Sequence, residues 1–453
     1  MTGDWRAQLD AVVRPALARS AAIDEIVIEA GAVARAGGLH RRVFGSAPAL
    51  LIADNNTFAA AGAATEAALQ EAGIVVRRHL LPAAPRPKAT MELAEALSRV
   101  IAESGARPWA VGSGVINDLV KYAAHRLDQA YLCVATAASM DGYASAGSPL
   151  SERGFKKTIP CRAPRGILAD LTVMAAAPAV MTGWGFGDLA GKVPAGGDWI
   201  LADALGVEPI DGIAWPMVQD NLDGWLADPS GVVAGAPDAV AGLSIGLILT
   251  GLAMEAHGSS RPASGADHQI AHVWEMEGLS QDGEPVSHGA CVAVGALTVL
   301  GLFDWLLEQD LTRLDVERIL ARAATLEAKR AAIEAAFPQP AIAERALIET
   351  AAKHLEPAAQ RARLERIIEI WPALRERLRA HLMTRDEMAG LLARAGAPCR
   401  GGDIGVDPAH HRATVLAARF QRSRYTVLDL LDETGLLEPA VEAVFSQPFF
   451  QAA

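Results

Sequence analysis

The chain has 453 residues, of which 51% are hydrophobic and 21% are charged, and its formal net charge is −12 at pH 7. This length and composition are typical of a globular protein with two or more domains, and they exclude an intrinsically disordered chain. The acidic balance argues against nucleic acid, and against an anionic membrane surface, as a partner.

Targeting and membrane signals are weak. The first ten residues, MTGDWRAQLD, lack the apolar stretch of a secretion signal. The longest apolar run, residues 239–254, is short for a membrane span and contains Ser, Thr and Gly, so we expect a buried helix and no membrane insertion. The cysteines form no pattern and stand at Cys133, Cys161, Cys291 and Cys399. A cytoplasmic protein with reduced thiols is therefore expected.

The first 175 residues alternate short apolar runs with alanine-rich amphipathic ones. The predicted strands cover residues 49–57, 73–81, 109–114, 130–137 and 166–174. Predicted helices over residues 58–73 and 90–105 end at Gly73 and Gly105. Strands and helices that alternate at this interval predict right-handed βαβ crossovers and a parallel sheet.

From about residue 176 the strand signals stop, and the rest of the chain reads as helix. We therefore predict an α/β nucleotide-binding domain with a parallel sheet over residues 1–175 and an all-helical domain over residues 176–453. The cofactor and a metal are expected in the cleft between them.

The stretch GSGVIND, residues 112–118, follows a predicted strand and opens a predicted helix. Gly112 and Gly114 would let the backbone turn tightly and approach a pyrophosphate, with amides of the helix N-terminus as donors. A plain structural turn explains the same residues, since many such turns contain glycine.

Two further segments carry polar side chains at strand ends. Asp54 is placed to accept hydrogen bonds from ribose hydroxyls, or to cap a helix. In VATAASMDGYAS, residues 134–145, Thr136 and Ser139 can bond a cofactor. Asp141 lies where a substrate or a metal-bound water could reach it, although Asp-Gly is also a standard turn pair.

The segment GWGFGDLAGK, residues 183–192, offers a carboxylate among small residues. Asp188 is interpreted as lying at the start of a helix, where it is either a helix cap or a metal ligand. Lys192 lies one helical turn further on and would point the same way.

Three of the eleven histidines fall within residues 268–288. His268 and His272 are four residues apart and share one face of a helix, and His288 precedes an apolar helix from which its ring can project. Neither HExxH nor a CxxC pair is present. Two histidines and an aspartate with an open position suit a Lewis-acid metal that polarises an alcohol oxygen.

The motifs GSGVIND, ATAASMDGYAS, GFGD, SGADHQIAH and HG, in this order, resemble the sn-glycerol-1-phosphate dehydrogenases. These share a fold with glycerol dehydrogenase, iron-containing alcohol dehydrogenases and dehydroquinate synthase. The resemblance runs from about residue 49 to 301, and residues 424–437 also resemble the C-terminal part of the bacterial members.

The resemblance implies a role for each matching residue. Asp188, His268 and His288 match the metal ligands, and His272 and Asp141, together with Asp188, match positions that contact substrate. The implied NAD(P) site consists of Asp54, Gly112, Ser113, Gly114, Val115, Ile116, Asn117, Asp118, Thr136, Ala137, Ala138, Ser139 and Ser145.

The chain departs from the family pattern at three places. Asp267 stands where the family usually has Glu, VPAGGDW replaces an aromatic-containing run, and ATAAS replaces ATAPS. The proposed ligands survive these changes, so the reaction type is better supported than the substrate.

The implied activity is metal-assisted hydride transfer between NAD(P)H and dihydroxyacetone phosphate, which yields sn-glycerol 1-phosphate. His272, or a water near Asp141, would supply the proton. The implied cofactors are NAD or NADP, with Asp54 favouring NAD, and one divalent zinc, nickel or iron ion.

A small phosphorylated three-carbon substrate needs cations, for which Lys121, Lys156, Lys157 and Lys192 are candidates. A glycerol or other polyol dehydrogenase, a dehydroquinate synthase-like enzyme and a non-catalytic metal- or nucleotide-binding protein are the alternatives. A homodimer is expected.

Overall fold

The computed structural model of the protein describes residues 5–152 and 155–451. Two compact units divide the chain. The first unit contains residues 1–189, 213–263 and 394–396, and the second contains residues 190–212, 264–393 and 397–453. A division into independent domains at residue 175 stays a prediction.

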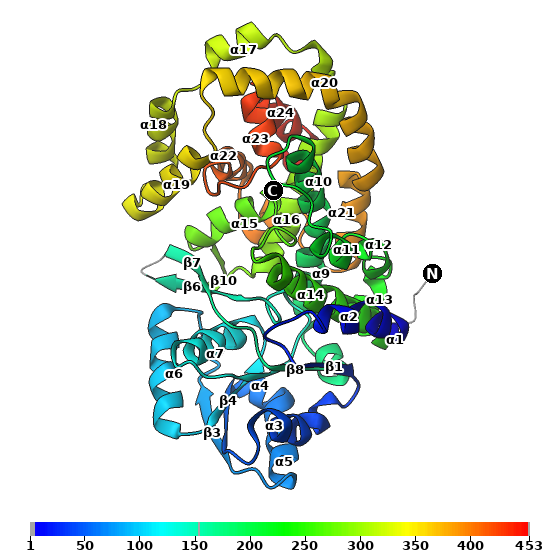
Figure 1. Ribbon diagram of the computed structural model, residues 1–453, viewed down its shortest axis with the longest axis vertical. Coiled ribbons are helices and arrows are strands. Elements are labelled where there is room, and N and C mark those ends of the chain that lie inside the picture. Colours follow the sequence, from blue (N-terminus) through cyan, green and yellow to red (C-terminus); the bar gives the residue numbers. More distant parts are fainter. Residues whose placement is uncertain (1–4, 153–154, 452–453) are drawn as a thin grey trace. The chain divides into compact units, whose positions relative to one another are not determined.

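The first unit is built on a six-stranded sheet in the order β1-β8-β5-β4-β2-β3, in which every neighbouring pair is parallel. The strands are β1 (Glu25–Glu29), β2 (Ala49–Asp54), β3 (Val76–Leu81), β4 (Arg107–Gly112), β5 (Leu132–Ala135) and β8 (Gly166–Asp170). Helices connect the parallel strands, as Figure 1 shows in blue and cyan. The predicted parallel α/β architecture is confirmed.

The helices of this unit surround the sheet, and helix α6 packs on α7 as α3 does on α5. They are α1 (Trp5–Gln8), η1 (Leu9–Val13), α2 (Arg14–Leu17), η2 (Ala32–Arg35), α3 (Ala36–Phe44), α4 (Asn55–Thr57), η3 (Phe58–Gly62), α5 (Ala63–Glu71), α6 (Met91–Ser104), α7 (Gly114–Arg126), α8 (Leu171–Ala175), α9 (Ala179–Ala190), α11 (Ala214–Val218), α12 (Leu222–Trp225), α13 (Pro229–Val233) and α14 (Pro237–His257).

The sequence missed three strands of this unit. One is the edge strand β1, and the others form the antiparallel hairpin of β6 (Gly147–Glu152) and β7 (Phe155–Pro160). The strand predicted over residues 166–174 ends at Asp170, because the Asp170 carboxylate accepts a hydrogen bond from Thr172 N at 3.0 Å and begins helix α8. Asp170 also accepts from Gly31 N at 3.0 Å, which joins the end of β8 to the chain after β1.

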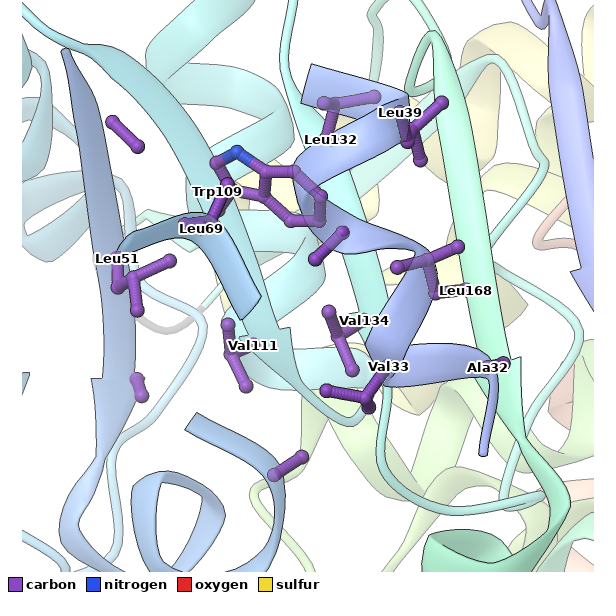
Figure 2. Packing of buried hydrophobic residues seen from close by; sticks show 14 of the residues in the cluster. Ala32, Val33, Leu39, Leu51, Leu69, Trp109, Val111, Leu132, Val134 and Leu168 are labelled. Atoms are coloured by element: carbon purple, nitrogen blue, oxygen red, sulfur yellow. The ribbon is translucent and has the colours of Figure 1, made fainter. Parts of the chain in front are cut away.

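The core of the sheet is apolar and contains one oriented polar pair. Trp109 and Val111 of β4 pack with Leu51 of β2 in the cluster drawn in Figure 2. The Trp109 indole N–H donates to His40 Nδ1 at 3.1 Å. His40 Nε2 therefore carries the proton and donates to the carbonyl of Ala47 at 2.8 Å. Burial lowers the pKa of His40, so the ring is neutral.

The second unit is helical, which confirms the prediction for the C-terminal part of the chain. Its helices are α10 (Lys192–Ala204), α15 (Ala266–Met276), α16 (His288–Leu307), η4 (Leu311–Arg313), α17 (Val316–Arg322), α18 (Leu326–Ala336), α19 (Pro340–Lys353), α20 (Pro357–His381), α21 (Arg385–Arg394), η5 (Gly401–Ile404), α22 (Pro408–Ala418), α23 (Val427–Glu433), α24 (Leu437–Phe445) and α25 (Pro448–Gln451). Only a short hairpin of β9 (Ser280–Gln281) and β10 (Glu284–Pro285) interrupts them within the described residues.

Helices α14 and α16 are long and apolar enough to cross a membrane by length and composition alone. Within the protein, 78% of the apolar window of α14 and 89% of that of α16 is buried. Burial of this extent is typical of the central helices of a folded unit. No disulfide joins the four cysteines, all of which lie in the described part of the chain.

Candidate functional site

The turn between β4 and α7 is tight because of the residues around it. A Cβ atom on Gly112 would lie 2.6 Å from Cβ of Ile116, so the position accepts only glycine. Ser113 precedes α7 and makes no side-chain cap to it. The first amides of a helix without a side-chain cap are available to an anion such as a phosphate.

The residues predicted to hold a dinucleotide gather around this turn. The segment Gly114–Asp118 forms the first part of α7, and residues 136–139 follow β5. Thr136 N donates to the carbonyl of Gly112 at 3.2 Å, which joins the two segments. The side chain of Asn117 forms hydrogen bonds within the protein. Its amide nitrogen donates to the carbonyl of Gly142, and its amide oxygen accepts from the hydroxyl of Tyr131.

Asp54 is a helix cap, the second of the two roles considered for it. It ends β2, and its carboxylate accepts from Thr57 N at 2.8 Å, which caps the short helix α4. The backbone amide of Asp54 in turn donates to the Thr57 hydroxyl at 3.0 Å. A contact of Asp54 with a ribose stays a prediction.

Lys121 fixes the loop that follows the dinucleotide segment. Its ammonium is fully buried and donates to Gly142 O at 2.7 Å, Gly147 O at 3.0 Å and Ser145 Oγ at 3.2 Å. Burial lowers the pKa of Lys121, and the Asp118 carboxylate at 3.9 Å opposes that shift. All three donors are used inside the protein, so the idea that Lys121 holds a substrate phosphate is wrong.

The remaining lysine candidates differ in exposure. Lys157 lies exposed on β7, and the side chain of Lys156 lies outside the described residues. Lys192 is fully buried at the start of α10, not one turn along the helix of Asp188 as predicted, because α9 ends at Ala190.

Asp188 lies in the last turn of α9, so the prediction that it starts a helix is wrong. The glycines before it, Gly183, Gly185 and Gly187, lie inside the helix. A Cβ atom on Gly185 would lie 1.9 Å from the carbonyl oxygen of Ala138, so α9 packs directly on the loop after β5. The Asp188 carboxylate accepts from Asp141 N at 3.0 Å. Asp188 and Asp141, both predicted to act on substrate, are thereby brought together.

The three histidines come together in the second unit. His268 and His272 lie one turn apart on α15, and His288 is the first residue of α16, as predicted. The His288 ring centroid lies 5.2 Å from that of His268 and 5.5 Å from that of His272, and the two rings on α15 are 6.1 Å apart. Ligand atoms of His268 and His288 lie within 4.8 Å of each other, as do those of His272, Glu275 and His288, so the cluster is a candidate metal centre.

Each ring of this cluster has a carboxylate at Nδ1. Asp267 lies 2.6 Å from Nδ1 of His268. Glu275 lies 2.7 Å from Nδ1 of His272 and 2.9 Å from Nδ1 of His288. A carboxylate at Nδ1 holds a proton there and leaves the Nε2 lone pair for a metal or a substrate, which is how metal-binding histidines are usually oriented.

Close packing and one buried carboxylate hold the histidine helices in place. A Cβ atom on Gly295 of α16 would lie 2.5 Å from the carbonyl oxygen of Asp267, so α16 packs directly on the backbone of α15 at this point. Asp198, fully buried on α10, accepts from Ala266 N at 2.7 Å and from Val427 N at 2.6 Å. Its charge therefore lies at the amino ends of α15 and α23, where helix dipoles favour it.

Sequence reasoning missed Glu275, Asp198 and Gly295. Glu275 had a signal, since it lies three residues after His272 and seven after His268 and so shares their helix face. Asp198 and Gly295 act on residues far away in the sequence and had none.

Comparison with known proteins now identifies the relatives of the chain. Residues 27–178 match the family model described as iron-containing alcohol dehydrogenase. The chain is 32% identical over 286 residues to the glycerol-1-phosphate dehydrogenase (NAD(P)+) of Methanothrix thermoacetophila, which covers 62% of this chain and 77% of that protein. The chain belongs to the glycerol-1-phosphate dehydrogenase family.

Bacterial members of the family are also similar. The glycerol-1-phosphate dehydrogenase (NAD(P)+) of Bacillus velezensis is 34% identical over 253 residues, which cover 54% of this chain and 62% of that protein. The glycerol-1-phosphate dehydrogenase (NAD(P)+) of Geobacillus thermodenitrificans is 32% identical over 248 residues, which cover 54% of this chain and 61% of that protein. The chain thus spans less than two thirds of the length of these two curated relatives.

Solved structures support the fold. A probable glycerol dehydrogenase from Sinorhizobium meliloti aligns with a TM-score of 0.59 at 18% identity, covering 93% of this chain and 98% of that one. A maleylacetate reductase from Agrobacterium tumefaciens aligns with a TM-score of 0.56 at 17% identity, over 93% and 97%. These neighbours share the architecture of the family.

Proposed function

We propose that the protein is a metal-dependent NAD(P)H oxidoreductase that interconverts dihydroxyacetone phosphate and sn-glycerol 1-phosphate. The observation that carries the proposal is the cluster of His268, His272 and His288, each with a carboxylate at Nδ1. Membership of the glycerol-1-phosphate dehydrogenase family supports the substrate.

The donor set fits one divalent zinc, nickel or iron ion. Imidazole nitrogens and a carboxylate oxygen suit all three metals. In this proposal His268, His288 and Asp188 would hold the ion, the two histidines through Nε2. An open position is then left for the substrate oxygen, as in catalytic sites.

The dinucleotide would lie along the ends of the parallel strands of the first unit. There the amides at the start of α7 would bind its pyrophosphate, beside Gly112 and Thr136. Asp54 would accept from the ribose, which favours NAD over NADP. Brought close by its backbone bond to Asp188, Asp141 would orient the substrate.

Proton transfer is the step of the reaction that this chain's own residues perform. When bound, the nicotinamide supplies a hydride and the metal supplies a Lewis acid at the carbonyl. In the direction of reduction, His272 protonated at both nitrogens would give its Nε2 proton to the former carbonyl oxygen and become neutral, keeping the Nδ1 proton that faces Glu275. Glu275 keeps the Nδ1 side of that ring occupied, so the ring stays oriented while the proton leaves.

The test compares the oxidation of NADH and of NADPH with dihydroxyacetone phosphate and with unphosphorylated dihydroxyacetone, on metal-reconstituted protein. We expect rapid turnover of the phosphate ester that His268→Ala abolishes. His410→Ala is the matched control, because His410 pairs with Glu277 at 2.7 Å in the same unit but outside the cluster. A preference for the unphosphorylated ketone would favour a polyol dehydrogenase. Turnover of neither, by a protein that binds NADH, would overturn the substrate assignment.

The cellular location and the oligomeric state of the protein are part of the same proposal. The acidic net charge of −12 and the burial of both long apolar helices support a soluble protein of the cytoplasm. We propose a homodimer, since twofold dimers are the commonest assembly of soluble proteins. Light scattering of the purified chain measures its mass against the 47.5 kDa of one subunit.

A further inference from the structure

Glu275 lies near the C-terminal end of α15, the helix that also carries His268 and His272. Its two carboxylate oxygens contact different rings. Oε2 faces Nδ1 of His272 at 2.7 Å, and Oε1 faces Nδ1 of His288 at 2.9 Å. The side chain is 9% exposed, so water competes little for either oxygen. One carboxylate thus joins a ring on α15 to a ring on α16.

The two contacts have the lengths of charge-assisted hydrogen bonds between an imidazole nitrogen and a carboxylate oxygen. His268 has its own carboxylate, Asp267, so only His272 and His288 depend on Glu275.

We propose that Glu275 is a positioning residue that fixes the orientation and the tautomer of His272 and His288 together. It holds a proton at Nδ1 of both rings and directs both Nε2 atoms away from itself. The consequence for metal binding and proton transfer rests on the function proposed above, in which His288 binds the ion and His272 supplies the proton. The ligand ring and the proton-donor ring then cannot change orientation independently.

Glu275→Gln tests the proposal, because an amide has one acceptor oxygen in place of two. One ring would keep its Nδ1 proton, while the ring that faces the amide NH2 group would have to move its proton to Nε2. Glu277→Gln is the matched control, since Glu277 follows α15 directly and pairs with a histidine outside the cluster, His410.

Two measurements are made on each variant. Nitrogen-15 spectra of histidine-labelled, metal-free protein report the tautomers, with His272→Gln and His288→Gln for assignment. We expect Nδ1–H on both rings in the wild type and on one ring in Glu275→Gln. Competition with a zinc chelator is expected to show affinity roughly 10–100-fold weaker in Glu275→Gln and unchanged in Glu277→Gln.

The outcomes separate this proposal from the proposed function. Unchanged tautomers together with unchanged zinc affinity in Glu275→Gln would overturn the role of Glu275, whatever the enzyme turns over. Altered tautomers and weakened zinc binding, in a protein whose wild type reduces no carbonyl, would support Glu275 and contradict the proposed function. Glu275→Asp keeps the charge but is one methylene shorter, so it should bind zinc with intermediate affinity. If Glu275→Gln does not fold, a Glu275→Asp variant with wild-type affinity and tautomers would equally overturn the proposal.

Discussion

Gly295 of α16 lies against the backbone of Asp267 of α15, with room for a hydrogen atom but not for a methyl group. A Cβ atom at residue 295 would lie 2.5 Å from the Asp267 carbonyl oxygen and 3.3 Å from its Cα atom. The contact sets the separation of α15 and α16 next to His268. The geometry of the cluster therefore depends on a residue that touches none of its rings.

Gly295→Ala should push α16 away from α15 and weaken zinc binding by about tenfold, because His268 and His288 lie on opposite sides of this contact. Overpacking should also lower the free energy of unfolding by about 1–3 kcal/mol. Chelator competition and urea unfolding measure the two effects. Gly301→Ala on the same helix is the control, since its nearest atoms lie 3.4 Å away and alanine favours a helix. Equal effects of the two substitutions would contradict this explanation.

Lys121→Met should loosen the loop between β5 and β6. The substitution removes the charged donor from the carbonyls of Gly142 and Gly147, which would then accept only from neutral donors, the Ser145 hydroxyl and the Asn117 amide. A hydrogen bond from a charged group contributes about 1.5–3 kcal/mol. We expect a lower melting temperature and weaker NADH binding, measured by fluorescence titration. Lys157→Met, on the exposed face of β7, should change neither. NADH affinity that survives Lys121→Met would show that this loop is not part of the dinucleotide site.

His411 should make the second unit sensitive to acid. Burial, with a smaller effect of nearby His410, lowers the pKa of His411 to about 3. The ring packs against Trp274 and Phe445, with centroids 5.1 Å and 4.9 Å away, and Nε2 lies 2.9 Å from the Thr298 hydroxyl.

Between pH 6.5 and about 3 the unfolded chain binds a proton at this position that the folded chain does not bind, so stability falls as the pH falls. The full loss is about 5 kcal/mol. Urea unfolding of His411→Gln at a series of pH values should show a shallower slope in this window, even if the variant is less stable at neutral pH. His410→Gln should keep most of the slope. Parallel curves for wild type and His411→Gln would refute the assignment.

Local patterns were sufficient for five of the six strands of the sheet and for the helix that carries two of the histidines. The apolar runs that became β2, β4, β5 and β8 are bounded by polar or glycine residues, and Gly105 ends α6 in a left-handed conformation with φ 61°. Spacing alone put His268 and His272 on one face.

Three features could not be read from the sequence because each depends on a distant partner. Strand β1, with the sequence EIVIE, gains its place only by pairing with β8, about 140 residues later. The glycines before Asp188 favour a loop by local propensity, and only the packing of Gly185 on Ala138 explains why they are helical. Asp198 looks like an ordinary polar residue until its partners at residues 266 and 427 are known.

The carboxylate of Asp198 also imposes an order on biosynthesis. Its first amide partner, Ala266, is made about 70 residues after Asp198, but its second, Val427, is made only about 160 residues after Ala266. Until then the buried Asp198 carboxylate, which holds the amino end of the helix that carries His268 and His272, accepts only one of these two backbone hydrogen bonds. Loading with metal is thus expected only after Val427 has been made, and a truncation before Val427 would weaken the histidine cluster from more than 130 residues away.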